Sequence, residues 1–361
     1  MGSAANITAG AIVVLLGLGG CDSALSGGQA SSDGRVSEAA PDRGSIPGAD
    51  TSPPVLDSST LQDGEARPVP DAATPAPDAT SPVPDAKPTG WTLGQIPFAP
   101  SSSWNTPIAA GATFGKLNWP ASTGYNYYVN WDAYSPAVHV SKPTDPLVQV
   151  AIPANWGWPA GNIPVRVAAG VTGAAGTDGE ILIIDGTTAH NFWQFKRTSN
   201  TTATAQAYGR ADVVTDSGWG STSPFLSAGI VATGSSQLAG LLVQAETDAG
   251  EIGHALQIAL DAALQKPGYT GEAIGGDGSS PSGIAQEGQR FAIPPGVSMP
   301  AGLSSLGHKV FRAMQTYGVF DIDVAGGTTV LRAQANAYDA VTMASLRNDV
   351  QVLIPLLQLV K

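Results

Sequence analysis

The sequence Glu180-Ile181-Leu182-Ile183-Ile184-Asp185 decides the fold class of this 361-residue chain. Its four consecutive apolar residues predict a strongly apolar β-strand that ends at an acidic residue. A second apolar segment, Asn191-Phe192-Trp193-Gln194-Phe195, follows a few residues later. Two such segments so close together favour a β-rich domain.

Shorter apolar segments of the same kind lie upstream and alternate apolar with polar residues, as half-buried strands do. They are Val138-His139-Val140, Val148-Gln149-Val150-Ala151-Ile152 and Val165-Arg166-Val167. Gly, Pro, Asn and Ser separate them, which is typical of turns. The pattern predicts a mainly β domain, an antiparallel β-sandwich or barrel.

Three later segments indicate a few peripheral helices. Leu303, Leu306, Val310 and Tyr317 recur at helical spacing, and Gly318 follows as a stop signal. Residues 337–359 predict a C-terminal helix that Pro355 interrupts, whereas residues 251–265 fit a strand or a helix equally well.

Five short motifs, in this order along the chain, resemble those of a group of secreted bacterial proteins of unknown function. They are Ser103-Trp104-Asn105-Thr106-Pro107, Gly176-Thr177-Asp178-Gly179, Asn191-Phe192-Trp193, His254-Ala255-Leu256 and Tyr317-Gly318. The resemblance spans roughly residues 96–325 and implies no activity. It implies that these positions belong to one domain.

The N-terminal region predicts export and anchoring. An apolar run over residues 11–20 is too short to cross a bilayer, which takes about 20 residues, and has the length of a signal-peptide core. Leu18-Gly19-Gly20-Cys21 resembles the bacterial lipobox, which implies cleavage after residue 20 and lipidation of Cys21. The alternative is an ordinary apolar N-terminus with a cysteine. Cys21 is the only cysteine, so no disulfide or thiolate chemistry is expected.

Residues 21–90 are expected to form a disordered tether. Pro70-Asp71-Ala72 recurs as Pro77-Asp78-Ala79 and Pro84-Asp85-Ala86, and such Pro-rich sequence favours extended, solvated conformations. The predicted organisation is therefore a signal peptide (1–20), a lipidated tether (21–90) and a globular domain (91–361). The domain would be held outside the cytoplasm, lipid-anchored to the bacterial cell envelope.

Most of the acidic charge belongs to this tether. Residues 22–88 hold eleven Asp and Glu against four Lys and Arg, a net −7 of the chain's formal −12. The domain is only mildly acidic and its sequence has no basic stripe, so nucleic acid is not an expected partner. His and Asp spacings match no metal or nucleotide motif, so no metal or other cofactor is expected.

Aromatic residues predict a glycan-binding surface. All eight tryptophans lie between residues 91 and 219, several among glycines where a turn exposes a flat indole face suited to sugar rings. The candidate substrate-binding residues are Trp104, Asn105, Trp156, Trp158, Trp193, Trp219, Arg210 and Arg290. The alternative is that these tryptophans pack in the core or in turns.

Two carboxyl groups and two histidines are the candidate catalytic residues. Asp178 and Glu180 point to the same side of an extended chain, and glycosidases need two carboxyl groups facing one cleft. His254, or His190, is the candidate base of a β-elimination, with Asn105, Arg210 or Arg290 neutralising a uronate carboxylate. The alternatives are an ordinary Thr-Asp-Gly turn and histidines satisfied within the core.

Export, tether, β-rich architecture and aromatic loops together predict an enzyme that cleaves an extracellular polysaccharide. Hydrolysis and β-elimination both stay open, as a glycoside hydrolase or a polysaccharide lyase. One rival is a non-catalytic glycan-binding or adhesion lipoprotein, which would use the same aromatics. The other is a structural envelope protein whose tryptophans are buried.

Overall fold

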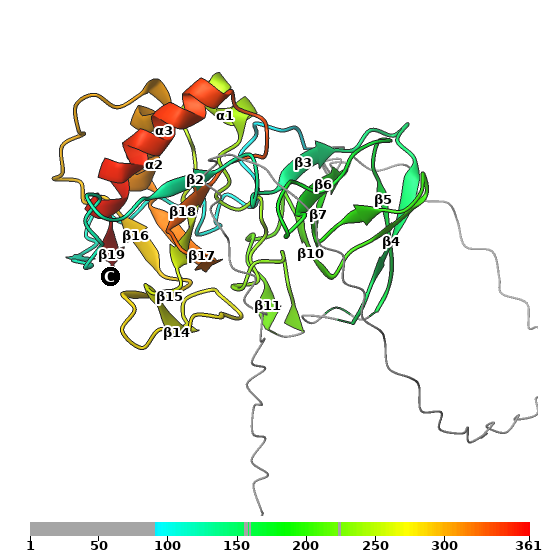
Figure 1. Cartoon of the computed structure of the whole chain (residues 1–361), viewed down its shortest axis with the longest axis horizontal. Coiled ribbons are helices and arrows are strands. Elements are labelled where there is room, and N and C mark those ends of the chain that lie inside the picture. The colour runs from blue at the N-terminus through cyan, green and yellow to red at the C-terminus, as the bar shows by residue number, and fades with distance from the viewer. Residues whose placement is uncertain (1–90, 155–157, 159, 223–224) are drawn as a thin grey trace, which may run out of the picture. The chain divides into compact units, whose positions relative to one another are not determined.

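A computed structural model describes residues 91–361 except residues 155–157, 159 and 223–224. The described residues belong to one compact unit, in which strands far outnumber helices (Figure 1). The mainly β prediction is confirmed. The predicted signal peptide, the lipidation site Cys21 and the tether lie outside the described residues.

The largest sheet, called here the large sheet, has seven strands in the order β1-β19-β16-β17-β13-β18-β2. Their bounds are β1 Phe114–Gly115, β2 Tyr128–Asn130, β13 Leu256–Asp261, β16 Arg290–Ala292, β17 Val319–Ala325, β18 Val330–Arg332 and β19 Gln358–Val360. The pairs β13–β17 and β18–β2 are parallel, and the other neighbours are antiparallel. Residues 251–265 therefore contain a strand, not a helix.

Two helices cover this sheet with their apolar sides (Figure 1). They are α2 (Ser305–Thr316) and α3 (Ala340–Leu353). The Ser304 hydroxyl accepts the backbone N–H of Gly307 at 3.0 Å and so caps α2. Gly318, with φ of +79°, ends the segment in the left-handed region that glycine favours.

The C-terminal segment departs from the predicted interrupted helix. The helix α3 ends at Leu353, the 3₁₀ turn η1 (Ile354–Leu356) contains Pro355, and β19 follows immediately. Pro355 lacks the N–H that a continuing helix needs, so the chain turns and joins the large sheet instead.

The segment between β2 and β13 (residues 131–255), called here the inserted segment, leaves the large sheet and forms two four-stranded sheets. One has the order β10-β7-β6-β3, with β3 Ala137–Val140, β6 Ile181–Asp185, β7 Thr188–Trp193 and β10 Ala207–Asp212. The other has the order β5-β4-β9-β8, with β4 Leu147–Ile152, β5 Gly161–Arg166, β8 Lys196–Arg197 and β9 Thr202–Thr204.

The strand β6 explains why residues 181–184 are continuously apolar. Ile181 and Ile183 pack with Val148 and Val150 of β4, whereas Leu182 and its neighbour Ile184 pack on the other side among the core tryptophans. A strand covered on both faces has no solvent side on which to place polar residues. The antiparallel sandwich prediction holds for β4–β5, β6–β7 and β7–β10, while β3–β6 and β4–β9 are parallel.

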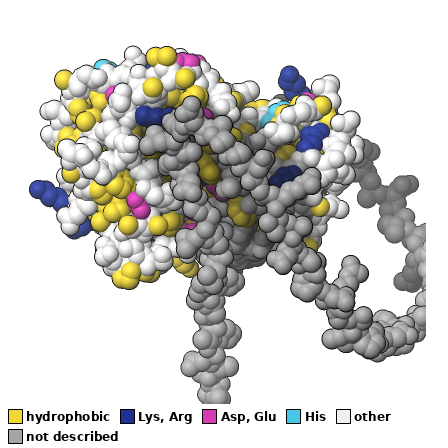
Figure 2. Space-filling view, viewed as in Figure 1, with side chains coloured by type: hydrophobic (Ala, Val, Ile, Leu, Met, Phe, Trp, Pro, Cys, Tyr) yellow, Lys and Arg dark blue, Asp and Glu magenta, His cyan; other side chains and the backbone are white. Residues whose placement is uncertain are grey.

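Short elements complete the described chain. They are the helix α1 (Gln244–Ala249) and the strands β11 (Ser221–Thr222), β12 (Phe225–Leu226), β14 (Gln265–Tyr269) and β15 (Ala285–Glu287). Within residues 91–361, apart from the six that are not described, no helix has the length and apolarity to span a bilayer. On the face drawn in Figure 2, the described Lys and Arg side chains are scattered singly.

Candidate functional site

Three carboxyl groups meet at one edge of the large sheet. Asp277 lies in the loop between β14 and β15, Glu287 ends β15, and Asp323 lies on β17. One carboxylate oxygen from each lies within 4.8 Å of the others. Glu287 is fully buried, whereas Asp277 and Asp323 are half-buried.

The loop before β15 fixes the Glu287 carboxylate. Its Oε2 accepts the backbone N–H groups of Asp277 at 2.8 Å and Gly278 at 3.1 Å. A Cβ atom at residue 276 would collide with the same oxygen, so the close approach requires Gly276. The loop therefore binds the Oε2 atom of Glu287 and makes no hydrogen bond to its Oε1 atom.

Burial and crowding of like charges favour the neutral forms of these acids. Burial raises the pKa of Glu287 to about 10, and the charges of Asp277, Asp321 and Asp323 add to the effect. Burial also raises the pKa of Asp321 and of Asp323 well above the ordinary range. Carboxyl groups this close cannot all ionise without a compensating cation.

A second charged group, from the inserted segment and β18, borders the first. Glu180 is 5% exposed and forms an ion pair with Arg332. Burial raises the pKa of Glu180, the charge of Arg332 opposes this, and the charge of Asp178 adds to it. The charges of Asp178, Glu180 and Arg332 also act on the pKa of Asp323, so the two groups interact electrostatically.

We call these six residues the carboxylate site: Asp178, Glu180, Asp277, Glu287, Asp323 and Arg332. The register of β13 and β17 shifts between Ile258 and Ala259, opposite Asp321 and Asp323. Bulges of this kind are common beside functional sites because they re-aim side chains.

Of the predicted catalytic residues, the structure brings Asp178 and Glu180 into this site. Trp193, predicted to bind substrate, lies beside them, because its indole N–H donates to Asp178 Oδ1 at 3.3 Å. The sequence analysis missed Asp277, Glu287, Asp323 and Arg332. The glycine-rich sequence 275–278 could have indicated Asp277, because glycines in such a loop mark a place where its backbone packs closely on another part of the protein.

His254 is not placed to act as a base, which corrects the sequence-based expectation. It is 2% exposed; its Nδ1 donates to the Ala255 carbonyl at 2.8 Å, and its Nε2 lies 2.9 Å from Glu246 Oε2. Burial by itself lowers the pKa of His254, but the bond to Glu246 and its charge outweigh burial and raise it. This histidine is a buried structural partner of Glu246.

His190 is likewise separate from the carboxylate site. It lies on β7, its Nδ1 is 2.8 Å from the Tyr208 hydroxyl, and its ring stacks on Phe192. It is 9% exposed, and burial lowers its pKa to about 4. The expectation that His190 removes a substrate proton is corrected by this burial.

The buried His190 predicts an acid-sensitive fold. Its pKa is about 6.5 in an unfolded chain and about 4 in the folded protein, so between these values the unfolded chain binds the extra proton. Stability should therefore fall as the pH drops through this window. Between pH 6.5 and pH 5, the free energy of unfolding measured in urea should fall by about 2 kcal/mol more in the native protein than in the His190→Gln variant. His308→Gln is the matched control, and an equal loss in H190Q would contradict the assignment.

Two of the predicted sugar-binding tryptophans are core residues, which corrects that expectation. Trp104 is 1% exposed and stacks on Trp219, with ring centroids 5.1 Å apart. Trp219 is 6% exposed and donates to Ser103 Oγ at 2.9 Å. Their faces are covered because both pack against Phe320. Trp156 lies outside the described residues.

Asn105 and Arg290 stabilise loops. The Asn105 amide donates to the Pro97 carbonyl at 2.8 Å. Arg290 donates to the carbonyls of Tyr317 at 2.7 Å and Thr106 at 2.6 Å, and burial lowers its pKa to about 10. These bonds hold the two side chains within the protein, and their role towards a substrate carboxylate stays a prediction.

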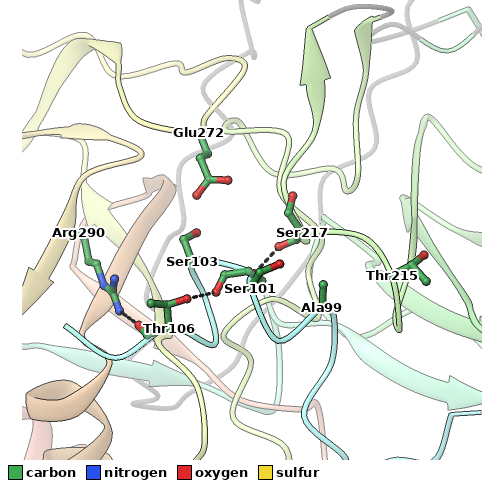
Figure 3. A pocket seen from close by; sticks show the side chains of 9 residues that line it. Ala99, Ser101, Ser103, Thr106, Thr215, Ser217, Glu272 and Arg290 are labelled. Carbon is green, nitrogen blue, oxygen red and sulfur yellow. Dashed lines mark hydrogen bonds between the residues drawn. The ribbon is translucent and has the colours of Figure 1, made fainter. Parts of the chain in front are cut away.

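A surface cavity of about 340 Å³ lies beside Arg290. Figure 3 shows Glu272 facing Ser103 across it. A second cavity, of about 490 Å³, is lined by Trp158, Arg210 and one edge of Trp219, and the two share Ser217. The exposed Arg210 guanidinium lies 5.4 Å above the Trp158 ring. These predicted binding residues therefore do meet at a cavity.

Comparison with known proteins gives this site no precedent. No protein-family model, no curated protein and no solved structure matches the chain. The function must therefore be argued from the carboxylate site itself.

Proposed function

We propose that this protein is an exported enzyme that cleaves an extracellular polysaccharide, and that it does so by glycoside hydrolysis. The observation that carries the proposal is the meeting of Asp178 and Glu180 with the acidic edge of the large sheet. Hydrolysis of a glycosidic bond needs two carboxyl groups in different environments at one site. Because His190 is bonded to Tyr208 and His254 to Glu246 and the Ala255 carbonyl, the carboxyl chemistry is favoured over a histidine-based elimination.

The two acids have environments suited to different roles. Burial raises the pKa of Glu180, although its ion pair with Arg332 opposes this rise. A carboxyl group with a raised pKa suits the general acid that protonates the leaving oxygen. Asp178 is half-buried and oriented by the Trp193 indole N–H, which suits the base or nucleophile on the sugar.

A second candidate function is glycan binding without cleavage. It is favoured by the cavity that Trp158 and Arg210 line, since aromatic and guanidinium groups both bind sugar hydroxyls and rings. An adhesion lipoprotein would use this cavity and need no acid or base.

The proposal keeps the predicted location of the domain: anchored to the cell envelope through a lipid on Cys21, outside the cytoplasm. A Cys21→Ala variant should lose incorporation of a labelled lipid precursor in cells and appear in the soluble fraction. Unchanged labelling in C21A would contradict lipidation at this cysteine.

The experiment that tests the activity is a panel of neutral and acidic polysaccharides incubated with the full chain. New reducing ends without an ultraviolet-absorbing unsaturated sugar would indicate hydrolysis. Asp178→Asn and Glu180→Gln should each lower kcat by about 10²–10⁴-fold, the usual contribution of a general acid or base.

Glu251→Gln is the matched control, because Glu251 lies in an exposed ion pair with Arg312. It should leave turnover unchanged. Full activity in D178N and E180Q would contradict the assigned pair. Unsaturated products would contradict hydrolysis, and saturable binding with no product from any polysaccharide would favour the adhesin.

A further inference from the structure

The edge of the large sheet at Asp277, Glu287 and Asp323 presents oxygen atoms that lack donors. Glu287 Oε1 and Asp277 Oδ1 are buried and have no hydrogen-bond partner among the described residues. Carboxylate oxygens accept hydrogen bonds and, when ionised, donate none. Buried acceptors without donors cost free energy unless a proton or a cation satisfies them.

An independent observation comes from Asp321, which lies outside this trio. Its side chain is fully buried, and one oxygen accepts the Gln265 amide N–H at 2.8 Å. Its other oxygen, Oδ1, has no partner among the described residues, nor has Gln265 Oε1. Asp321 lies two residues before Asp323 on the same strand, β17, so this unpaired acceptor is close to the trio along the chain.

The guanidinium of Arg332 forms an ion pair with the buried Glu180, which lies outside the trio.

The donor set and its spacing select the kind of cation. All three groups are carboxylates, which are hard oxygen ligands that suit Ca²⁺ or Mg²⁺ rather than thiolate- or imidazole-binding metals. Two oxygens bound to one Ca²⁺ at about 2.3–2.6 Å lie at most about 5 Å apart, whereas the shorter bonds of Mg²⁺, about 2.0–2.1 Å, limit them to about 4 Å. The three oxygens all lie within 4.8 Å of one another, which is inside the span that one Ca²⁺ can bridge.

The loop that carries Asp277 is built to hold its ligand group still. The backbone N–H groups of Asp277 and Gly278 fix Glu287 Oε2, and this leaves Oε1 free to bind a cation. Gly276 allows the loop to approach Glu287 closely, and Gly278 allows it to approach the backbone of Lys266.

We propose that Asp277, Glu287 and Asp323 bind one calcium ion, with the buried Asp321 as a further negative group behind them. The inference goes beyond the proposed hydrolysis, because it concerns the protein without substrate. Other oxygen ligands, such as water, would complete the coordination of the ion.

The test is calcium binding by the purified full chain after treatment with a chelator. Isothermal titration with CaCl₂ should show one saturable site per chain, and Tm should rise with the calcium concentration. A parallel titration with MgCl₂ should bind more weakly. Absence of saturable binding at millimolar calcium would overturn the proposal, and tighter binding of Mg²⁺ would overturn the calcium assignment.

Two variants test the ligands. Glu287→Gln and Asp277→Asn should each weaken calcium binding by at least about 10–100-fold, the cost of losing even an outer-shell partner of a metal. Asp277 is half-buried, so D277N keeps the test decisive if E287Q fails to fold. Asp248→Asn, on the exposed end of α1, is the control and should bind calcium as the native protein does.

Unchanged affinity in both ligand variants would overturn the assignment. Because calcium is measured without a polysaccharide, failure of the hydrolase proposal leaves this result intact. If calcium binding is absent, the effects of D178N and E180Q on turnover still test the hydrolase proposal.

Discussion

Replacing Arg332 with methionine is expected to lower the free energy of unfolding by about 3–5 kcal/mol, the usual cost of breaking a buried ion pair. The Arg332 and Glu180 side chains are 5% and 6% exposed, so the variant would leave a carboxylate without a partner in the interior. The carboxyl groups of Asp178 and Asp323 nearby would add repulsion. Glu180 would then be driven to its neutral form.

Urea unfolding at neutral pH measures this effect, and the chain contains its own control. Arg312 pairs with Glu251 on the surface, where the side chains are 45% and 58% exposed. Arg312→Met should cost at most about 1 kcal/mol, because solvent screens an exposed pair. The double variant E180Q/R332M should regain part of the stability, since it buries no charge. Equal losses in R332M and R312M would contradict the buried pair.

Replacing Trp104 with alanine should cost about 3–5 kcal/mol of stability, which is typical of truncating a buried aromatic residue. The ring packs against both Trp219 and Phe320, with centroid distances of 5.1 Å and 4.7 Å. A Cβ atom at Gly240 would lie 2.6 Å from Trp104 Cζ3, so the indole fills its site without slack. The neighbouring residues cannot close the resulting cavity fully.

The same variant, W104A, distinguishes a core role of Trp104 from a role in binding sugar. Denaturant unfolding of W104A should show the loss of stability, and Trp158→Ala, at a half-buried ring beside Arg210, should cost less. Glycan binding should in turn weaken in W158A. If W104A kept full stability and lost glycan binding, the original expectation of a substrate-binding Trp104 would be restored.

Much of the fold could be predicted because the deciding patterns are local. The continuous apolar run of β6 and the alternation of β4 follow from which faces these strands bury. The helix α2 was predictable from its spacing and from Gly318. The parallel strand pairs could not be predicted. A long stretch of chain separates β13 from β17, and nothing in the local sequence indicates that these two strands pair.

The site could be predicted only in its local part. Asp178 and Glu180 are two residues apart in the turn that precedes β6, so the sequence alone brings them near each other. Arg332 lies about 150 residues further on, and only the pairing of strands in the large sheet brings it to Glu180. The prediction that Trp104 and Trp219 bind sugar was wrong for a different reason. A turn rich in glycine lets an indole either face solvent or pack in the core.

The inserted segment also has a consequence for the order in which the protein folds. Val330 of β18 pairs with Tyr128 of β2, about 200 residues earlier, so the large sheet has a high contact order. The hairpin β6–β7 and its core are built instead from residues close in sequence. Closing a long loop becomes less costly once the chain within it is compact. We therefore expect the inserted segment to form first and the large sheet to close over it in the slower, rate-limiting step.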